Sequence, residues 1–170
     1  MRRRSAVIRL ASLGGAAALA PWLLPRPVRA APQIEPLLAD SDLVYLSPVR
    51  ADGGLSRCQA EVWFVAEGST VWVVTAEGSW RARAVRAGRT TAQIWVGDLG
   101  NWTKTDGRYR ELPGYLATAE FVTDASQQSA VLERFGSKYP MSWVLWGPRF
   151  RNGLADGSRV MLRYVPDVLG

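Results

Sequence analysis

Six short runs rich in β-branched and aromatic residues, separated by glycine-containing turns, are the feature that most constrains this fold. They occupy residues 43–49, 57–66, 71–74, 90–96, 115–122 and 159–164. Runs of this length and alternation are typical of half-buried β-strands, and short glycine turns favour antiparallel neighbours. Two or three helical segments accompany them. The pattern predicts a mostly β fold, a six-stranded antiparallel β-barrel with helices on its outside, in one domain over residues 31–170.

The third run leads into a sequence suited to holding a phosphate group. Residues 71–74 are followed by Thr75, a short turn, and Ser79, which can cap a helix that carries Arg81 and Arg83. Hydroxyls, the free N–H groups of a helix start and guanidinium groups all donate hydrogen bonds to phosphate oxygens. The stretch therefore predicts a site for a phosphorylated cofactor. The alternative is that Ser79 is an ordinary helix cap and that both arginines face solvent.

This stretch resembles the flavin-phosphate motif of the pyridoxamine 5′-phosphate oxidase-like family. In these flavin-binding split β-barrels a strand ending in Tyr-Thr is followed by a short turn and then Ser-Arg-Lys-Ala. Thr75 matches the threonine, Ser79 the serine and Arg81 the lysine, at the same spacing. Trp80 stands at the first basic position of the motif and removes one positive charge from the site. Whether Arg83, further along the helix, replaces that charge is left open by the sequence.

The resemblance implies a six-stranded split β-barrel of the FMN-binding type and a homodimeric flavin-dependent oxidoreductase that acts on a small-molecule redox substrate. It also implies that Trp63 and Trp80 shape the surroundings of the flavin ring. Pyridoxamine phosphate oxidation itself is disfavoured, because the second strand offers Gln59 and Glu61 where that oxidase has basic residues, and the chain has no histidine. The deazaflavin F420 and haem stay open as alternative cofactors. A non-catalytic cofactor-binding or assembly module of the same fold is the competing function.

The absence of histidine narrows the chemistry further. Without histidine, Ser-His-Asp and Cys-His catalysis are excluded, and so are most zinc sites. Cys58 is the only cysteine, so the chain forms no internal disulfide. We therefore expect no bound metal, and we expect that a bound cofactor carries any redox chemistry.

The first thirty residues read as an export signal of the twin-arginine type. They combine a basic start, an apolar run over residues 10–20 and a small-residue end at Ala30, where we expect cleavage. A general secretory signal is the alternative. The apolar run is too short for a permanent membrane span. We therefore expect an exported protein, periplasmic or extracellular.

The net charge of +6 does not indicate a nucleic-acid partner. Six of the 21 basic residues lie in the first thirty positions, and the remaining 15 match the 15 acidic residues. The mature chain is therefore formally neutral and lacks the electrostatic footprint of a polyanion-binding protein.

Three further local predictions concern the second half of the chain. Asp124 is placed to cap a helix that runs to residue 137, with a buried stripe of Val131, Leu132, Phe135 and Tyr139. Residues 99–114 are polar and rich in turns, and we expect a solvent-exposed hairpin there. Pro148 is expected at a helix start.

Overall fold

The structure is a computed structural model and describes residues 34–167. The leader predicted over residues 1–30 lies outside the described residues. The helices and strands follow one another along the chain in this order: α1 Ile34–Asp40, β1 Leu43–Pro48, β2 Ala60–Trp63, β3 Val65–Glu67, β4 Thr70–Ala76, α2 Trp80–Arg86, β5 Thr91–Val96, β6 Gly114–Val122, α3 Ala125–Lys138, α4 Pro140–Ala155 and β7 Arg159–Pro166.

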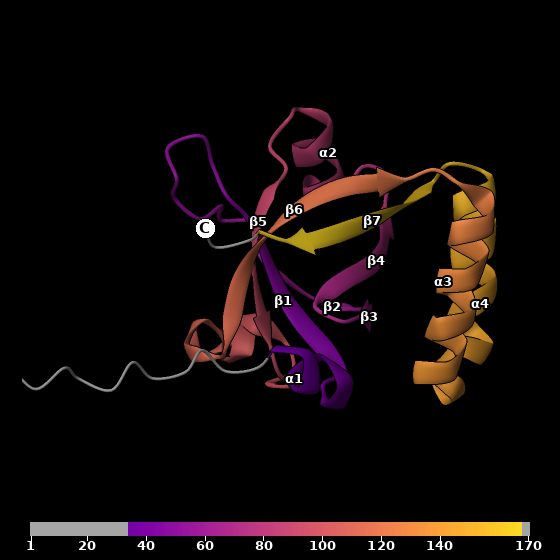
Figure 1. Cartoon of the computed structure of the whole chain (residues 1–170), viewed down its shortest axis with the longest axis horizontal. Helices are drawn as coiled ribbons and strands as arrows, with labels where there is room; N and C mark the ends of the chain where they lie inside the picture. The colour runs from indigo at the N-terminus through magenta and orange to yellow at the C-terminus, as the bar shows by residue number, and fades with distance from the viewer. Residues whose placement is uncertain (1–33, 168–170) are drawn as a thin grey trace, which may run out of the picture. The chain divides into compact units, whose positions relative to one another are not determined.

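All seven strands form one antiparallel sheet in the order β2-β1-β5-β6-β7-β4-β3 (Figure 1). The two edge strands, β2 and β3, follow each other in the chain, so the sheet curls back on itself into a nearly closed barrel. The mostly β, antiparallel class is therefore confirmed, with seven strands in place of six. The extra strand arises because the predicted run 57–66 divides: β2 pairs with β1, whereas β3 pairs with β4.

The division falls at Phe64, which we call the seam of the barrel. Side chains keep alternating through it: Val62 and Phe64 pack in the barrel core, whereas Val65 packs outside the barrel. The backbone of Phe64 is met there by the hydroxyl of Tyr139. The Phe64 N–H donates to this oxygen at 3.1 Å, and the hydroxyl lies 2.8 Å from the Phe64 carbonyl and 2.9 Å from that of Asp42. A side chain from α3–α4 thus takes the place of a strand neighbour.

The barrel interior is filled by inward-facing apolar side chains from every strand. Val44, Val71, Ile94 and Leu162 are all fully buried there. Leu38 of α1 belongs to the same cluster, and Val85 of α2 packs against it. Figure 1 shows α1 and α2 at opposite ends of the barrel, so each helix closes one end of the core.

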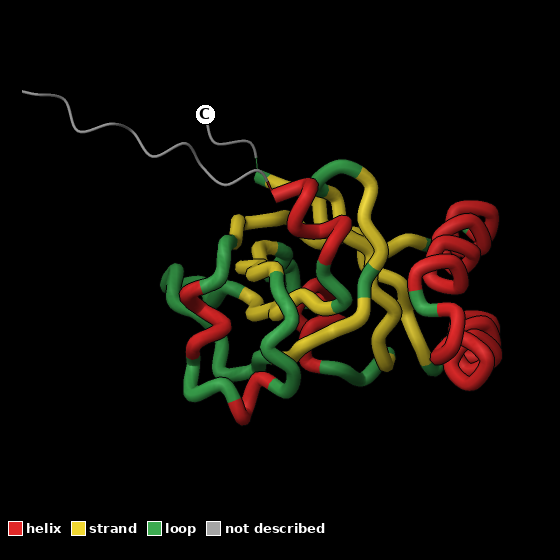
Figure 2. Tube along the Cα trace, turned by 90° about the horizontal axis from the view of Figure 1, so that it is seen from below, coloured by secondary structure: helices red, strands yellow, loops and turns green. Residues whose placement is uncertain are grey.

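Helices α3 and α4 lie beside each other against one outer face of the barrel (Figure 2). Asp124 caps α3 by accepting from the backbone N–H of Gln127 at 2.8 Å, as predicted. The predicted stripe is confirmed as well: its four members are buried in a second apolar cluster, which includes Trp72 of β4. Within residues 34–167, no helix has the length and hydropathy needed to cross a membrane.

Helix α4 begins earlier than predicted. Pro140 takes the first position, and Pro148 lies inside the helix, so the expectation that Pro148 starts a helix is wrong. The position nevertheless tolerates proline, because Pro148 and Val144, whose carbonyl would accept from residue 148, are both exposed. Water can therefore replace the missing N–H.

The segment between β5 and β6 is more ordered than the solvent-exposed hairpin we expected. It contains two short 3₁₀ helices, Trp102–Lys104 and Arg108–Glu111. Tyr109 is only 1% exposed. Its ring stacks on Tyr45 at 5.1 Å and meets Trp95 edge-on at 5.4 Å. The segment connects the antiparallel neighbours β5 and β6, as a hairpin does, but it is not exposed throughout, because Tyr109 packs against the outer face of β1 and β5.

Candidate functional site

The strand, turn and helix predicted as the phosphate site form as expected. β4 ends at Ala76, the N–H of Ser79 closes a turn on the Ala76 carbonyl at 2.9 Å, and α2 begins at Trp80. The Ser79 hydroxyl oxygen accepts from the N–H of Ala82 at 3.3 Å, which is an N-cap. At seven residues, α2 is short, so its backbone dipole adds little to anion binding and the side chains must provide most of it.

Arg81 is the unusual side chain of this region. Its Nε is fully enclosed, and among residues 34–167 it has no hydrogen-bond partner. No carboxylate of the described residues lies within ion-pair distance of its guanidinium either. Buried polar groups in proteins are usually paired, so an enclosed Nε without a partner, on a side chain that is otherwise half-buried, points to a missing anion.

Burial lowers the pKa of the Arg81 guanidinium, whereas Tyr164 and Glu61 act in the opposite direction. Arginine nevertheless stays protonated in proteins. Tyr164 is 1% exposed in the barrel core, and burial raises the pKa of its phenol, so it stays neutral. Glu61 lies on β2 and accepts from the backbone N–H of Trp102 at 3.2 Å. The surroundings of Arg81 therefore supply weak compensation and no contact ion pair.

Thr75 lies near the end of β4, opposite Val160 of β7. It is 5% exposed and falls on the same side of the strand as Val71 and Val73, which face the barrel core. The hydroxyl of Thr75 is thus a buried polar group at the end of the barrel from which α2 starts.

The other two predicted residues of α2 lie in different settings. Arg83 is exposed, and it follows Arg81 by two positions, which places it about 200° further around the helix. Trp80 is half-buried. The structure therefore does not bring Arg83 to the same side of the helix as Arg81.

Trp63 lies on β2 in the aromatic cluster beneath α4. Its ring stacks on Tyr139 at 4.9 Å and meets Trp146 edge-on at 6.1 Å. It also lines a small cavity of about 210 Å³ together with Val74 of β4 and Arg159 of β7. Trp63 thus packs with the α3–α4 pair.

Sequence reasoning missed both groups that act on Arg81. Glu61 alternates with its neighbours as an outward residue of a strand, and Tyr164 reads as one more core residue of the last strand. Neither position carries a local signal that points to α2. Their proximity depends on how the sheet curls, which pairs distant segments of the chain.

Comparison with solved structures identifies the fold. A candidate pyridoxamine 5′-phosphate oxidase from Listeria innocua matches with a TM-score of 0.52 and 15% identity, over 79% of this chain and 90% of its own. HutZ, the heme storage protein of Vibrio cholerae, matches with a TM-score of 0.53 and 17% identity, over 80% and 89%. An F420 reductase matches with a TM-score of 0.52 and 18% identity, over 79% and 93%.

The fold is the pyridoxamine 5′-phosphate oxidase-like split barrel. No protein-family model matches the chain, and no curated protein matches it. The similarity between this split barrel and its relatives is therefore structural, and it establishes the fold. Within residues 34–167, no group of three or more acidic, cysteine or histidine side chains is arranged to hold a metal ion.

Proposed function

We propose that this split barrel binds FMN, with the Arg81 guanidinium as the principal anchor of its phosphate, and acts as a flavin-dependent oxidoreductase. The observation that carries the proposal is the enclosed and unpaired Nε of Arg81. An unpaired charge in a desolvated position is costly, and a phosphate provides the bidentate acceptor that a guanidinium matches best.

Two hydroxyls support this assignment. The Ser79 oxygen accepts from Ala82, which leaves the hydroxyl hydrogen free to donate to a phosphate oxygen. Thr75, the first residue of the motif, lies near the end of β4 and is buried. We assign Trp80 and Trp63 to the surroundings of the ring, and Arg83 to a secondary electrostatic role, because it is exposed. A bound flavin would supply hydride or electron transfer at its ring.

A non-catalytic binding module is the second candidate. Trp80 replaces the first basic residue of the motif, and this loss of charge favours weaker or different cofactor binding. One structural relative is a heme storage protein and another an F420 reductase, so haem and F420 join FMN as ligands to test. Reduction of bound flavin by a nicotinamide donor separates an oxidoreductase from a storage module.

We further propose a homodimer. The exposed side of α4 carries three apolar side chains at helical spacing: Met141 is 89%, Val144 82% and Leu145 57% exposed. An apolar stripe of this kind on the outside of a helix supports self-association.

Export through the leader, with cleavage after Ala30, is also part of the proposal and predicts a periplasmic or extracellular location.

The proposal is tested by measuring the affinity of the purified protein for FMN and for riboflavin, which lacks the phosphate. We expect FMN to bind more tightly than riboflavin. Arg81→Met should weaken FMN binding by about tenfold to a hundredfold, the range for a charged hydrogen bond, and leave riboflavin binding unchanged. Arg83→Met is the matched control and should change FMN affinity by less than about threefold.

Circular dichroism and thermal unfolding confirm that both arginine variants keep the fold. Equal affinities of the wild-type protein for FMN and riboflavin, or an unchanged FMN affinity in Arg81→Met, would show that Arg81 does not hold the phosphate. Absence of any binding of FMN, F420 or haem would leave the chain without the proposed cofactor.

A further inference from the structure

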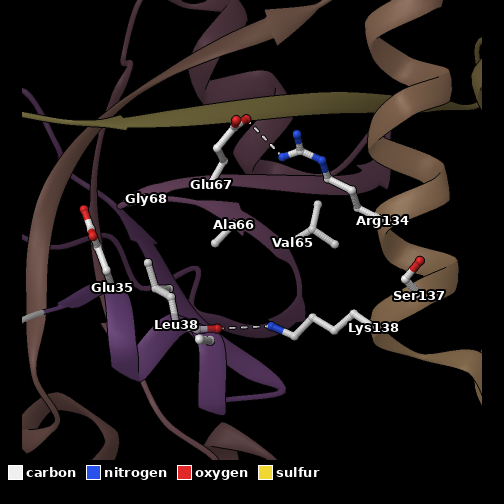
Figure 3. A pocket seen from close by; sticks show the side chains of 10 residues that line it. Glu35, Leu38, Val65, Ala66, Glu67, Gly68, Arg134, Ser137 and Lys138 are labelled. Carbon is white, nitrogen blue, oxygen red and sulfur yellow. Dashed lines mark hydrogen bonds and ion pairs between the residues drawn. The ribbon is translucent and has the colours of Figure 1, made fainter.

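A cavity of about 590 Å³ lies between α1, β3 and α3, and none of the residues assigned to the cofactor lines it (Figure 3). This volume is within the range of small-molecule sites. Its apolar wall comes from Leu38, Val65 and Ala66. Leu38 is 1% and Val65 3% exposed, so this wall is part of the packed interior and the cavity has a fixed floor.

Three of the charged groups around the cavity already have partners. The Arg134 guanidinium pairs with the Glu67 carboxylate at 3.0 Å, as Figure 3 shows. The Glu35 carboxylate accepts from the hydroxyl of Ser69 at 3.3 Å, and its oxygen lies next to Gly68 in the turn after β3. Glu35 therefore places negative charge at the end of the cavity formed by that turn.

Lys138 has no such partner. Its Nζ donates to the Leu38 carbonyl at 3.3 Å and lies 3.5 Å from the centre of the Phe64 ring. Among the described residues, no carboxylate lies within 4 Å of this amine. An ammonium group has three donor hydrogens; one is bonded to the Leu38 carbonyl and one side of the amine faces the Phe64 ring, so one donor remains available.

The environment of Lys138 makes its positive charge costly. Burial lowers the pKa of the Lys138 amine to about 8, although the negative charges of Asp42 and Asp98 act against the shift. A bound anion would remove part of this cost, because it places a negative charge in contact with the ammonium. The cavity thus combines an apolar wall, a cation on α3 that lacks a contact ion pair, and negative charge at the opposite end.

We propose that this cavity is a binding site for a small organic monoanion, a carboxylate with an apolar body, whose carboxylate pairs with the Lys138 ammonium. The apolar body would lie against Leu38 and Val65. The Glu35 carboxylate selects against a ligand with a second negative charge at the far end. This site is independent of the proposed FMN site, which depends on Arg81.

The test uses ¹⁹F NMR with two probes of the same shape, 4-fluorobenzoate and the neutral 4-fluorobenzyl alcohol. We expect the wild-type protein to bind the carboxylate at least about tenfold more tightly than the alcohol, because only the carboxylate forms a charged hydrogen bond. Lys138→Met should remove this preference. The chain has only one other lysine, the exposed Lys104, so Lys104→Met is the matched control and should bind like the wild-type protein.

The pH dependence of the wild-type protein provides a test that needs no variant. The affinity of the wild-type protein for 4-fluorobenzoate should fall by up to tenfold per pH unit above about pH 8, because the probe's carboxylate binds the protonated Lys138 amine. The other charged or titratable groups that face this amine are carboxylates, an arginine and a tyrosine: Glu35, Asp42, Glu67, Asp98, Arg134 and Tyr139.

Three results would each overturn the proposal. They are equal affinities for the two probes, unchanged benzoate binding in Lys138→Met, and an affinity that does not vary between pH 7 and 9.5. Failure of both probes to bind would do the same. FMN binding is measured in parallel, so loss of one site is distinguishable from loss of the other.

Discussion

The hydroxyl of Tyr139 should be a major source of stability, because it completes the hydrogen bonding of the barrel at its seam. Tyr139→Phe removes only this oxygen and keeps the ring, which stacks on Trp63. The variant leaves the N–H of the fully buried Phe64 without a partner, at a cost of about 1–3 kcal/mol. The bond that the hydroxyl donates, to the carbonyl of Phe64 or of Asp42, adds about 1 kcal/mol.

The expected loss in the free energy of unfolding is therefore about 2–4 kcal/mol, which corresponds to about 10 °C in the melting temperature of a domain of this size. Urea unfolding followed by circular dichroism measures it. Tyr115→Phe is the matched control, since the Tyr115 hydroxyl donates a single bond to the Ser69 carbonyl at 2.8 Å and should cost about 1 kcal/mol. Equal losses in the two variants, or unaltered hydrogen exchange at the Phe64 amide, would refute the role of the hydroxyl at the seam.

Three further predictions concern separate parts of the molecule. The ordinary pKa of Lys138 is 10.5, and folding lowers it to about 8, so between these pH values the unfolded chain binds more protons than the folded one. The free energy of unfolding should therefore rise from pH 8 to 10 relative to that of Lys138→Met, as measured by urea titration. Gly114→Ala should lower the free energy of unfolding by about 1–3 kcal/mol, because its Cβ would lie 2.4 Å from the Ile94 carbonyl oxygen. The control Gly78→Ala, whose Cβ meets open space, should stay within about 0.5 kcal/mol of wild type, and thermal unfolding compares the two variants. Val144→Lys should leave the melting temperature unchanged and convert the proposed dimer to a monomer in light scattering, and a dimer that persists would contradict the assignment of α4 as its interface.

Local signals predicted the elements that bear the candidate site. Ser79 and Asp124 were recognised as helix caps because a cap depends only on residues within three positions. The buried stripe of α3 was likewise readable from its spacing, with Phe135 at its centre. The position of Pro148 could not be predicted, because a proline at a helix start and a proline on an exposed helix face look alike in sequence. The proline at the helix start is Pro140.

The features that escaped prediction depend on contacts between distant segments. The break at Phe64 leaves the alternation of side chains intact, so nothing in residues 60–67 reveals that the pairing partner changes. Its compensation comes from Tyr139, 75 positions away. The burial of the Arg81 Nε could not be predicted either, because an arginine early in a short helix usually faces water, whereas this atom is enclosed.

The seam also leaves part of β4 without a strand neighbour on one side. Beyond Trp72, the described part of β4 has no ladder partner on its β3 side, because β3 pairs only up to that residue and β2 pairs with β1. The cavity at Trp63 and Val74 is lined by both of these parted strands. Two groups act against the lowering of the Arg81 pKa by burial: Glu61 on β2, which lines one side of this gap, and Tyr164 on β7, which pairs with β4 on its other side. A fully paired sheet would fill this space with backbone, whereas the parted sheet leaves a cavity between β2 and β4 that Trp63, Val74 and Arg159 line.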